Sequence, residues 1–449
     1  MDSLYNNQTN KIPYDDTPIF RKNSKQSSKN QKPIKVKVFV LMLAIMVVLN
    51  VALCITCYTY LQNGKIKNVN IYNDTFSSQE VTYLKDSMRA AKYSTVCIAA
   101  GMSEEKQNLL DDNQITTNYE FYHSTKSHGA GFLYKIEGDS AYFVTCFHVI
   151  NYASDENVAK NTRIWVLPST MLVPVEVELV SYLEKEDVAV LRYTHNDILA
   201  TLEGMVPVSV YDSTFVTEYE DVFTIGNPLN YGLTGTQGKL TAYRQILTVT
   251  GVEHSWMKTN TAINPGNSGG PLFNADGQFI GMVNANIPET TSGDPVSNMA
   301  FAIPGTLVLS IANNIIENDL KFSKPRAVNV GINFGVDEIM GIERYKDVYK
   351  DQNGEYKDLD QEYVIVKSFD NNSIAKAQGM KVHDRIVSVE IELLGSEESI
   401  VVPILNRYTF YEYAYAIKPS SFIKFNIQRQ NAQNETESLS ISVRATKYS

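Results

Sequence analysis

One short segment of the chain has the composition to display a reactive hydroxyl. Ser268 lies within residues 264–272, which read NPGNSGGPL, and has glycines close to it on both sides. Glycine reaches backbone conformations with positive φ, so a tight turn can present the Ser268 hydroxyl as a nucleophile. The same turn can aim the amides of Gly266 and Ser268 at one point, where they would stabilise an oxyanion. Taken alone, the segment also fits a hairpin loop without chemistry.

A histidine and an aspartate elsewhere in the chain supply the groups that such a serine needs. Among the six histidines, only His148 directly follows an apolar strand-like run, and a rigid strand end suits a general base. Asp187 opens the run DVAVL, where its carboxylate can accept the Nδ1–H of an imidazole and fix its tautomer. Each residue alone also fits a structural role. Together they predict a catalytic triad of His148, Asp187 and Ser268.

Closely spaced strand signals surround these three residues. They fall at 95–100, 131–134, 141–145, 163–167, 175–180 and 188–191, then from 222 through 281–283 to 301–303. Short strands with turns between them and no intervening helices predict a mainly β fold, with two six-strand lobes and the site between them. Around these strands, helices are predicted at about 77–92 and 306–316, and the polar segment 102–128 is predicted to be a long surface loop.

Composition and charge set the broad class of protein. The 449 residues suggest two or three domains, and a hydrophobic content of 43% is ample for their cores. Residues 1–37 hold eight basic and three acidic residues, a net charge of +5, whereas residues 62–449 hold 32 basic and 47 acidic residues, a net charge of -15. Such an acidic surface repels phosphate backbones and argues against nucleic acid as a partner.

An uncharged stretch separates these two regions. Residues 38–61 are 24 residues without a charge, and a helix of that length exceeds the roughly 30 Å hydrocarbon core of a bilayer. Lysines precede the stretch and tyrosines close it, so the positive-inside rule places residues 1–37 in the cytoplasm. The apolar run is too long for a cleaved signal, and no small-x-small site follows it. We therefore expect a single-pass anchor in the cell membrane, with residues 62–449 extracytoplasmic.

The four cysteines do not form a disulfide framework. Cys54 and Cys57 fall in the expected anchor, whereas Cys97 and Cys146 fall in strand-like runs. Free buried thiols are expected for the latter two, and a bridge between them stays open. Cys and His show no metal-ligand spacing. No metal and no other cofactor is therefore predicted.

Six motifs follow one another along the chain: GAGF at 129–132, TCFHVI at 145–150, DVAVL at 187–191, IGNP at 225–228, AINPGNSGGPL at 262–272 and FAIP at 301–304. In order and spacing they resemble the HtrA (DegP/DegS-like) family of trypsin-fold serine proteases over about residues 88–316. The resemblance implies a two-lobed chymotrypsin/trypsin-like double β-barrel. It implies His148 as base, Asp187 as its orienting acid and Ser268 as nucleophile. It also implies an oxyanion hole formed by the amides of Gly266, Asn267 and Ser268.

The resemblance also implies where substrate binds. Ala262 would lie at the base of the S1 pocket, and with no acid there the expected P1 residue is small or medium-sized and apolar. The strand containing Gly281 and Val283 would pair with the substrate backbone. Two positions depart from the family pattern: Asn260 stands where an aspartate is usual, and Cys146 with Phe147 where two asparagines are usual.

The C-terminal residues 327–449 resemble a PDZ domain, mainly through SIAKAQGMK at 373–381 and DRI at 384–386. Such a domain binds an extended C-terminus by strand addition. By resemblance, Val330, Gly331 and Ile332 would line the groove, with a helix around 411–416 as its other wall. A module that only spaces or regulates is the alternative.

These inferences give one domain order and one function. A cytoplasmic tail (1–37), a transmembrane anchor (38–61) and a juxtamembrane linker (62–87) precede a protease domain (88–316), a linker (317–326) and a PDZ-like α+β domain (327–449). We expect a membrane-anchored serine endopeptidase that degrades misfolded or damaged proteins through an acyl-enzyme; the resemblance implies a homotrimer. The alternative is a non-proteolytic or latent chaperone or peptide-sensing scaffold, because sequence does not show whether the oxyanion hole is preformed.

Overall fold

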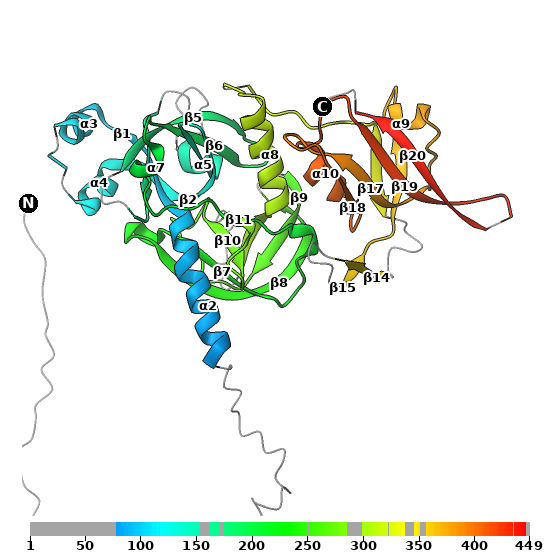
Figure 1. The fold of residues 1–449 in the computed structure, drawn as a ribbon, viewed down its shortest axis with the longest axis horizontal. Helices are drawn as coiled ribbons and strands as arrows, with labels where there is room; N and C mark the ends of the chain where they lie inside the picture. Colours follow the sequence, from blue (N-terminus) through cyan, green and yellow to red (C-terminus); the bar gives the residue numbers. More distant parts are fainter. Residues whose placement is uncertain are drawn as a thin grey trace, which may run out of the picture. The chain divides into compact units, whose positions relative to one another are not determined.

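The computed structural model, drawn in Figure 1, describes most of the chain from Ser78 onward. The described residues are 78–112, 114–115, 117–152, 162–170, 174–249, 252–284, 299–321, 323–336, 345–350, 356–433 and 435–445. The predicted tail 1–37 and anchor 38–61 lie outside them, as does most of the linker 62–87. No helix among the described residues has the length and apolar character needed to cross a membrane.

Six antiparallel strands close into a first barrel, in the order β1-β2-β3-β6-β5-β4. The strands are β1 (Thr95–Met102), β2 (Thr125–Glu137), β3 (Ser140–Thr145), β4 (Ile164–Pro168), β5 (Val175–Leu183) and β6 (Val188–Thr194). Large side chains such as Phe132 and Phe143 are completely buried and contribute to the core. At the end of β3, Thr145 pairs with Ala189 of β6. The residue that follows β3 and the residue that precedes β6 are therefore neighbours.

A second barrel of six antiparallel strands closes in the order β10-β11-β12-β9-β8-β7. The strands are β7 (Asp221–Gly226), β8 (Thr234–Val249), β9 (Val252–Thr259), β10 (Pro271–Asn274), β11 (Phe279–Asn284) and β12 (Ala300–Pro304). Phe279 packs on Phe132 of the first barrel with ring centroids 4.5 Å apart. The mainly β fold with two six-strand lobes is thus confirmed.

Two longer helices flank the barrels and confirm the two predicted ones. They are α2 (Ser78–Ala91) and α8 (Gly305–Glu317). On α8, Val308, Ile311 and Ile315 are completely buried, and their spacing of three and four residues places them on one face. Five shorter segments are η1 (Lys92–Ser94), α5 (Phe147–Ile150), α7 (Ile198–Thr201), η2 (Ser213–Phe215) and η3 (Pro228–Asn230).

The prediction that residues 102–128 form a long surface loop is wrong. The segment holds α3 (Glu104–Asp111) and α4 (Asn118–Ser124), and β2 already begins at Thr125. The side chains of Ser103 and Thr117 accept hydrogen bonds from backbone amides in the first turns of the two helices and so act as N-caps. Phe121 is 2% exposed and packs edge-on against Trp165. Burial of aromatic side chains, rather than an apolar period, orders this segment.

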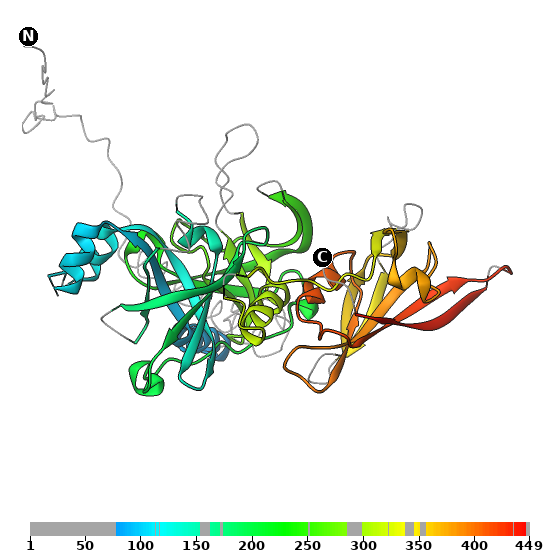
Figure 2. The ribbon, with the colours of Figure 1, turned by 90° about the horizontal axis from the view of Figure 1, so that it is seen from above.

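The C-terminal module is built on one antiparallel sheet of six strands, and β14 and β15 form a separate two-stranded sheet. The strand order of the six-stranded sheet is β13-β16-β17-β19-β20, with β18 added beside β17, and β13 is therefore an edge strand. The elements are β13 (Ile332–Val336), β14 (Tyr345–Lys350), β15 (Tyr356–Gln361), β16 (Val364–Phe369), α9 (Ile374–Ala377), β17 (Arg385–Glu392), β18 (Ser399–Pro403), α10 (Thr409–Ala414), β19 (Phe422–Gln430) and β20 (Thr436–Arg444). Figure 2 shows β19 and β20 as a long hairpin in orange and red. Identification of this α+β module as a PDZ domain stays a prediction.

We predict that Phe121→Ala lowers the free energy of unfolding by about 3 kcal/mol, because truncating a buried phenylalanine leaves a cavity beside Trp165. The measurement is urea denaturation followed by tryptophan fluorescence. Leu199→Ala is the control, since Leu199 is 69% exposed and its loss should change stability by at most about 0.5 kcal/mol. Equal effects of the two substitutions would contradict the packing described for α4.

Candidate active site

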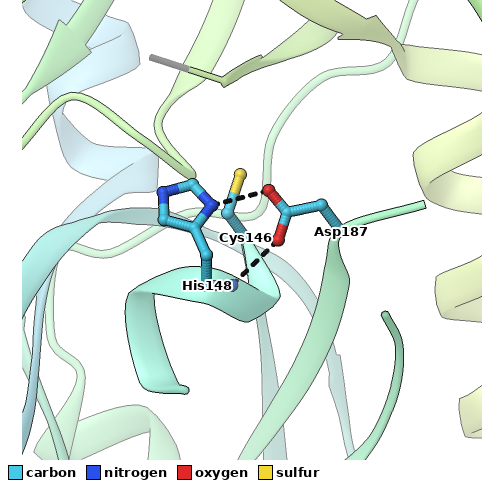
Figure 3. A group of neighbouring side chains, drawn as sticks. All are labelled: Cys146, His148 and Asp187. Atoms are coloured by element: carbon cyan, nitrogen blue, oxygen red, sulfur yellow. Dashed lines mark hydrogen bonds and ion pairs between the residues drawn. The ribbon is translucent and has the colours of Figure 1, made fainter. Parts of the chain in front are cut away.

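Asp187 and His148, predicted as acid and base, form a two-point contact. The Nδ1 of His148 lies 2.6 Å from Oδ2 of Asp187. The backbone N–H of His148 donates to Oδ1 at 2.8 Å. Both bonds are dashed in Figure 3. A carboxylate placed in this way holds the Nδ1–H tautomer, so Nε2 is the ring nitrogen left to accept a proton.

The backbone at Asp187 brings its carboxylate to this position. Asp187 has φ 53, in the left-handed region that aspartate tolerates better than most residues. Its carbonyl oxygen accepts from the N–H of Phe147, the first residue of α5. The short helix that carries His148 is therefore fixed to Asp187 through main chain and side chain together.

Asn284 is a third contributor to the site, and the sequence analysis missed it. Its Nδ2 donates to Oδ2 of Asp187 at 2.9 Å, and its side chain is buried at the end of β11. The two residues lie in different barrels and 97 positions apart. No sequence pattern marks this contact, because it depends on how β11 of one barrel meets β6 of the other.

Glycines bring the Ser268 turn close to the helix of His148. A Cβ at Gly129 would lie 2.8 Å from the Val149 side chain and 2.9 Å from the carbonyl oxygen of Ser268. Gly269 has φ +81, and a Cβ there would lie 2.8 Å from the amide nitrogen of Cys146. Ser268 itself is 7% exposed. The structure thus places the predicted nucleophile beside the segment that carries the predicted base.

The structure explains why position 266 is a glycine, and it contradicts the predicted oxyanion role of Asn267. Gly266 has φ +102, and a Cβ there would collide with the carbonyl oxygen of Asn227, so glycine is required. The Asn267 N–H donates to Asn264 O at 3.0 Å. Because this hydrogen bond uses the Asn267 amide within the turn, the inclusion of Asn267 is corrected: in this conformation, its N–H does not face an oxyanion. Gly266 and Ser268 remain the predicted donors.

The predicted substrate-pairing strand is also corrected. The N–H and C=O of Val283 bond to Gly270 O and Gly269 N at 2.8 and 2.9 Å. Gly281 pairs with Leu272 on β10, and β12 pairs along the other side of β11. Both edges of β11 are therefore occupied, and neither Gly281 nor Val283 can add a substrate strand.

Two other positions near the serine, Ala262 and Asn260, have surface or structural roles in this conformation. Ala262 is exposed, and its carbonyl oxygen accepts from the Thr236 hydroxyl at 2.9 Å. Its role in specificity stays a prediction. Asn260, which departs from the family pattern, accepts from the Lys239 N–H at 2.7 Å through its side-chain oxygen. That bond tightens the contact between β8 and the end of β9.

Cys97 and Cys146 are both free and buried, so the bridge left open between them does not form. The Cys146 thiol donates to Val283 O at 3.4 Å. Burial raises the pKa of the Cys146 thiol well above its ordinary value, and the nearby negative charge of Asp187 raises it further. Burial likewise raises the pKa of Cys97 to about 12. Both thiols are therefore protonated at neutral pH.

The predicted groove residues of the C-terminal module lie where its edge strand begins. The Val330 carbonyl oxygen accepts from the Ala375 N–H at 3.2 Å, and Gly331 has φ +72. Ile332 is the first residue of β13. Farther along β13, Phe334 packs against Phe410 of α10, with ring centroids 5.5 Å apart. The strand and helix proposed as groove walls therefore lie side by side.

Comparison with known proteins agrees with this geometry. A profile of the trypsin-like peptidase domain matches residues 129–282, which include all three predicted triad residues. Serine protease Do-like HtrA of Lactococcus lactis subsp. cremoris (strain MG1363) is 31% identical over 281 residues, 59% of this chain and 65% of that protein. Serine endoprotease DegS of Salmonella typhimurium (strain 14028s / SGSC 2262) is 28% identical over 294 residues, 65% of this chain and 71% of that protein. The solved HtrA-type protease AlgW with tripeptide covers 81% of this chain and 96% of its own at 18% identity, but its TM-score of 0.47 is too low to carry a conclusion.

The double barrel, the His148–Asp187 pair and the profile match together indicate a trypsin-like peptidase domain that includes residues 129–282. The relatives confirm the resemblance to HtrA-family serine proteases that the motifs predict. The HtrA of Lactococcus lactis strain MG1363 and two further proteins named Serine protease Do-like HtrA are matched over 65%, 55% and 49% of their own length. The chain therefore spans about half to two thirds of these proteins.

We predict that Asn284→Ala lowers kcat for a peptide substrate about tenfold with little change in KM. A hydrogen bond to a charged group is worth about 1.5–3 kcal/mol, and its loss lets the Asp187 carboxylate move away from the geometry that fixes His148. Steady-state kinetics of the purified protein measure this. Asn431→Ala, in the turn between β19 and β20, is the matched control and should keep the wild-type kcat. An unchanged kcat in Asn284→Ala would contradict the role assigned to this amide.

Proposed function

We propose that this protein is a serine endopeptidase that cleaves proteins through an acyl-enzyme. The observation that carries the proposal is the His148–Asp187 contact at 2.6 Å beside the Ser268 turn. Its components come from both barrels, and no cofactor is needed for the chemistry. The trypsin-like profile match and the HtrA-type relatives support the same reaction.

We propose one task for each group. His148 Nε2 takes the Ser268 proton as the hydroxyl oxygen attacks the scissile carbonyl carbon, and Asp187 stabilises the imidazolium that forms. The N–H groups of Gly266 and Ser268 stabilise the oxyanion. His148 then gives its proton to the leaving amine. A water molecule, activated by the same histidine, hydrolyses the acyl-enzyme and restores Ser268.

The proposed substrates are misfolded or damaged proteins outside the cytoplasm. The uncharged stretch 38–61 supports membrane anchoring, with the acidic remainder of the chain facing outward. Ala262 at the expected S1 position supports cleavage after small or medium-sized apolar residues. The HtrA resemblance supports a homotrimer.

The proposed task of the C-terminal module is to bind peptide C-termini. Among the described strands, β13 pairs only with β16, so its outer edge is available for strand addition, and α10 lies beside β13 through the Phe334–Phe410 contact. Val330, Gly331 and Ile332, at the start of β13, are the expected carboxylate end of the groove.

The experiment that tests the proposal is digestion of unfolded casein by the purified full-length protein, beside Ser268→Ala. Loss of the nucleophile should lower kcat about 10^6-fold while the fold is retained. Circular dichroism checks the fold of both proteins.

Cleavage by both proteins would mean that Ser268 is not the nucleophile or that a contaminant cleaves casein. Cleavage by neither, with both folded and both binding unfolded casein, would contradict the peptidase and favour the non-proteolytic chaperone or scaffold instead.

A further inference from the structure

Three side chains of different chemistry, those of Cys146, His148 and Asp187, lie close together. Cys146 Sγ, His148 Nδ1 and a carboxylate oxygen of Asp187 all lie within 4.8 Å of one another (Figure 3). We propose that this cluster is an inhibitory binding site for a thiophilic divalent cation such as Zn²⁺. The inhibitory consequence rests on the proposed peptidase function; the binding itself does not.

The donor set fits Zn²⁺. Thiolate sulfur, imidazole nitrogen and carboxylate oxygen are the ligands that this ion takes in proteins, usually in tetrahedral geometry. Bond lengths of about 2.3 Å to sulfur and about 2.0 Å to nitrogen and oxygen put tetrahedral ligand atoms about 3.3–3.6 Å apart. The Nδ1 to Oδ2 distance is 2.6 Å. The ring and the carboxylate therefore need to move apart by about 1 Å to admit the ion. The sulfur selects against Mg²⁺ and Ca²⁺, which prefer oxygen ligands.

The ligands are held by rigid elements, and the ion can reach them. Cys146 follows β3 and precedes the first residue of α5, and its side chain is completely buried. The side chains of His148 and Asp187 are 32% and 18% exposed. The ion therefore approaches from the His148 side, where water can fill the fourth position.

Contacts already present would keep the carboxylate oriented when an ion binds. The His148 N–H holds Oδ1 of Asp187, and the Asn284 amide holds Oδ2. Supporting hydrogen bonds of this kind orient ligands and strengthen metal sites. Two contacts have to give way: the Nδ1–H contact with Asp187 and the hydrogen bond from the Cys146 thiol to Val283 O.

Binding would stop the peptidase through the histidine. The ion takes the place of the proton on Nδ1, the neutral ring carries its proton on Nε2 instead, and the proton on the Cys146 thiol leaves to solvent. Because Nε2 is then already protonated, it no longer accepts the Ser268 proton. Removing the ion with a chelator lets the thiol regain its proton and the ring return to the Nδ1–H tautomer, which restores the original contacts.

The test uses full-length protein in a Cys54→Ser/Cys57→Ser background, which removes the other two cysteines outside the described residues. Co²⁺ is added to metal-free protein, and thiolate-to-cobalt charge-transfer absorption is recorded in the near ultraviolet. Separately, Zn²⁺ is titrated into a peptide-cleavage assay and then removed with EDTA. We expect one Co²⁺ per chain with a thiolate band, and zinc inhibition that EDTA reverses.

Variants decide whether Cys146 is a ligand. Cys146→Ala should lose the cobalt band and need at least about tenfold more Zn²⁺ for the same inhibition, because losing a ligand costs no less than losing an outer-shell partner. Cys146→Ser keeps a small polar side chain and should lose the thiolate band as well. Cys97→Ala is the matched control, since Cys97 is also a free buried thiol, and should keep both responses.

The outcomes separate the two proposals. No cobalt band in folded wild-type protein, or equal zinc inhibition in wild type and Cys146→Ala, would overturn the site. A cobalt band that depends on Cys146, in protein that cleaves nothing when metal-free, would support the site and count against the peptidase.

Discussion

The Asp187 carboxylate is the interaction on which the rest of the site depends. It accepts from the main chain and ring of His148 and from the Asn284 amide. Hydrogen bonds to an ionised acceptor are about twice as strong as neutral ones, so three of them restrict both the acid and the imidazole. Because Asn284 belongs to the second barrel, the geometry of the base depends on correct association of the two barrels.

Close backbone approach is the second constraint. Gly129 lets the first barrel reach the carbonyl of Ser268, and Gly266 lets the turn pass the carbonyl of Asn227. A methyl group at either position would push the nucleophile away from His148. The same close packing of the two barrels buries the Cys146 thiol against Val283. The thiol there lies near both Asp187 and His148.

Local signals were sufficient for the barrels and for the candidate triad, because strand alternation and the glycine-flanked serine are encoded within a few residues. Contacts that depend on tertiary pairing could not be predicted. Asn284 meets Asp187 across 97 positions. The resemblance implies that Val283 pairs with substrate, but the sequence does not reveal that both edges of β11 are already occupied. Phe121 lies in a segment without an apolar period, so the sequence did not predict helix α4. The contact with Trp165 that buries Phe121 forms only in the folded barrel.

Covalent labelling with a fluorophosphonate probe tests the central claim most directly, because phosphonylation of a serine needs an activated hydroxyl and oxyanion donors but no particular substrate. Mass spectrometry of the labelled, folded protein locates the modified residue. The account predicts one label per chain, on Ser268, formed about 10^4-fold more slowly or not at all in His148→Ala. Labelling of a different serine, or labelling of Ser268 at the same rate without His148, would contradict it.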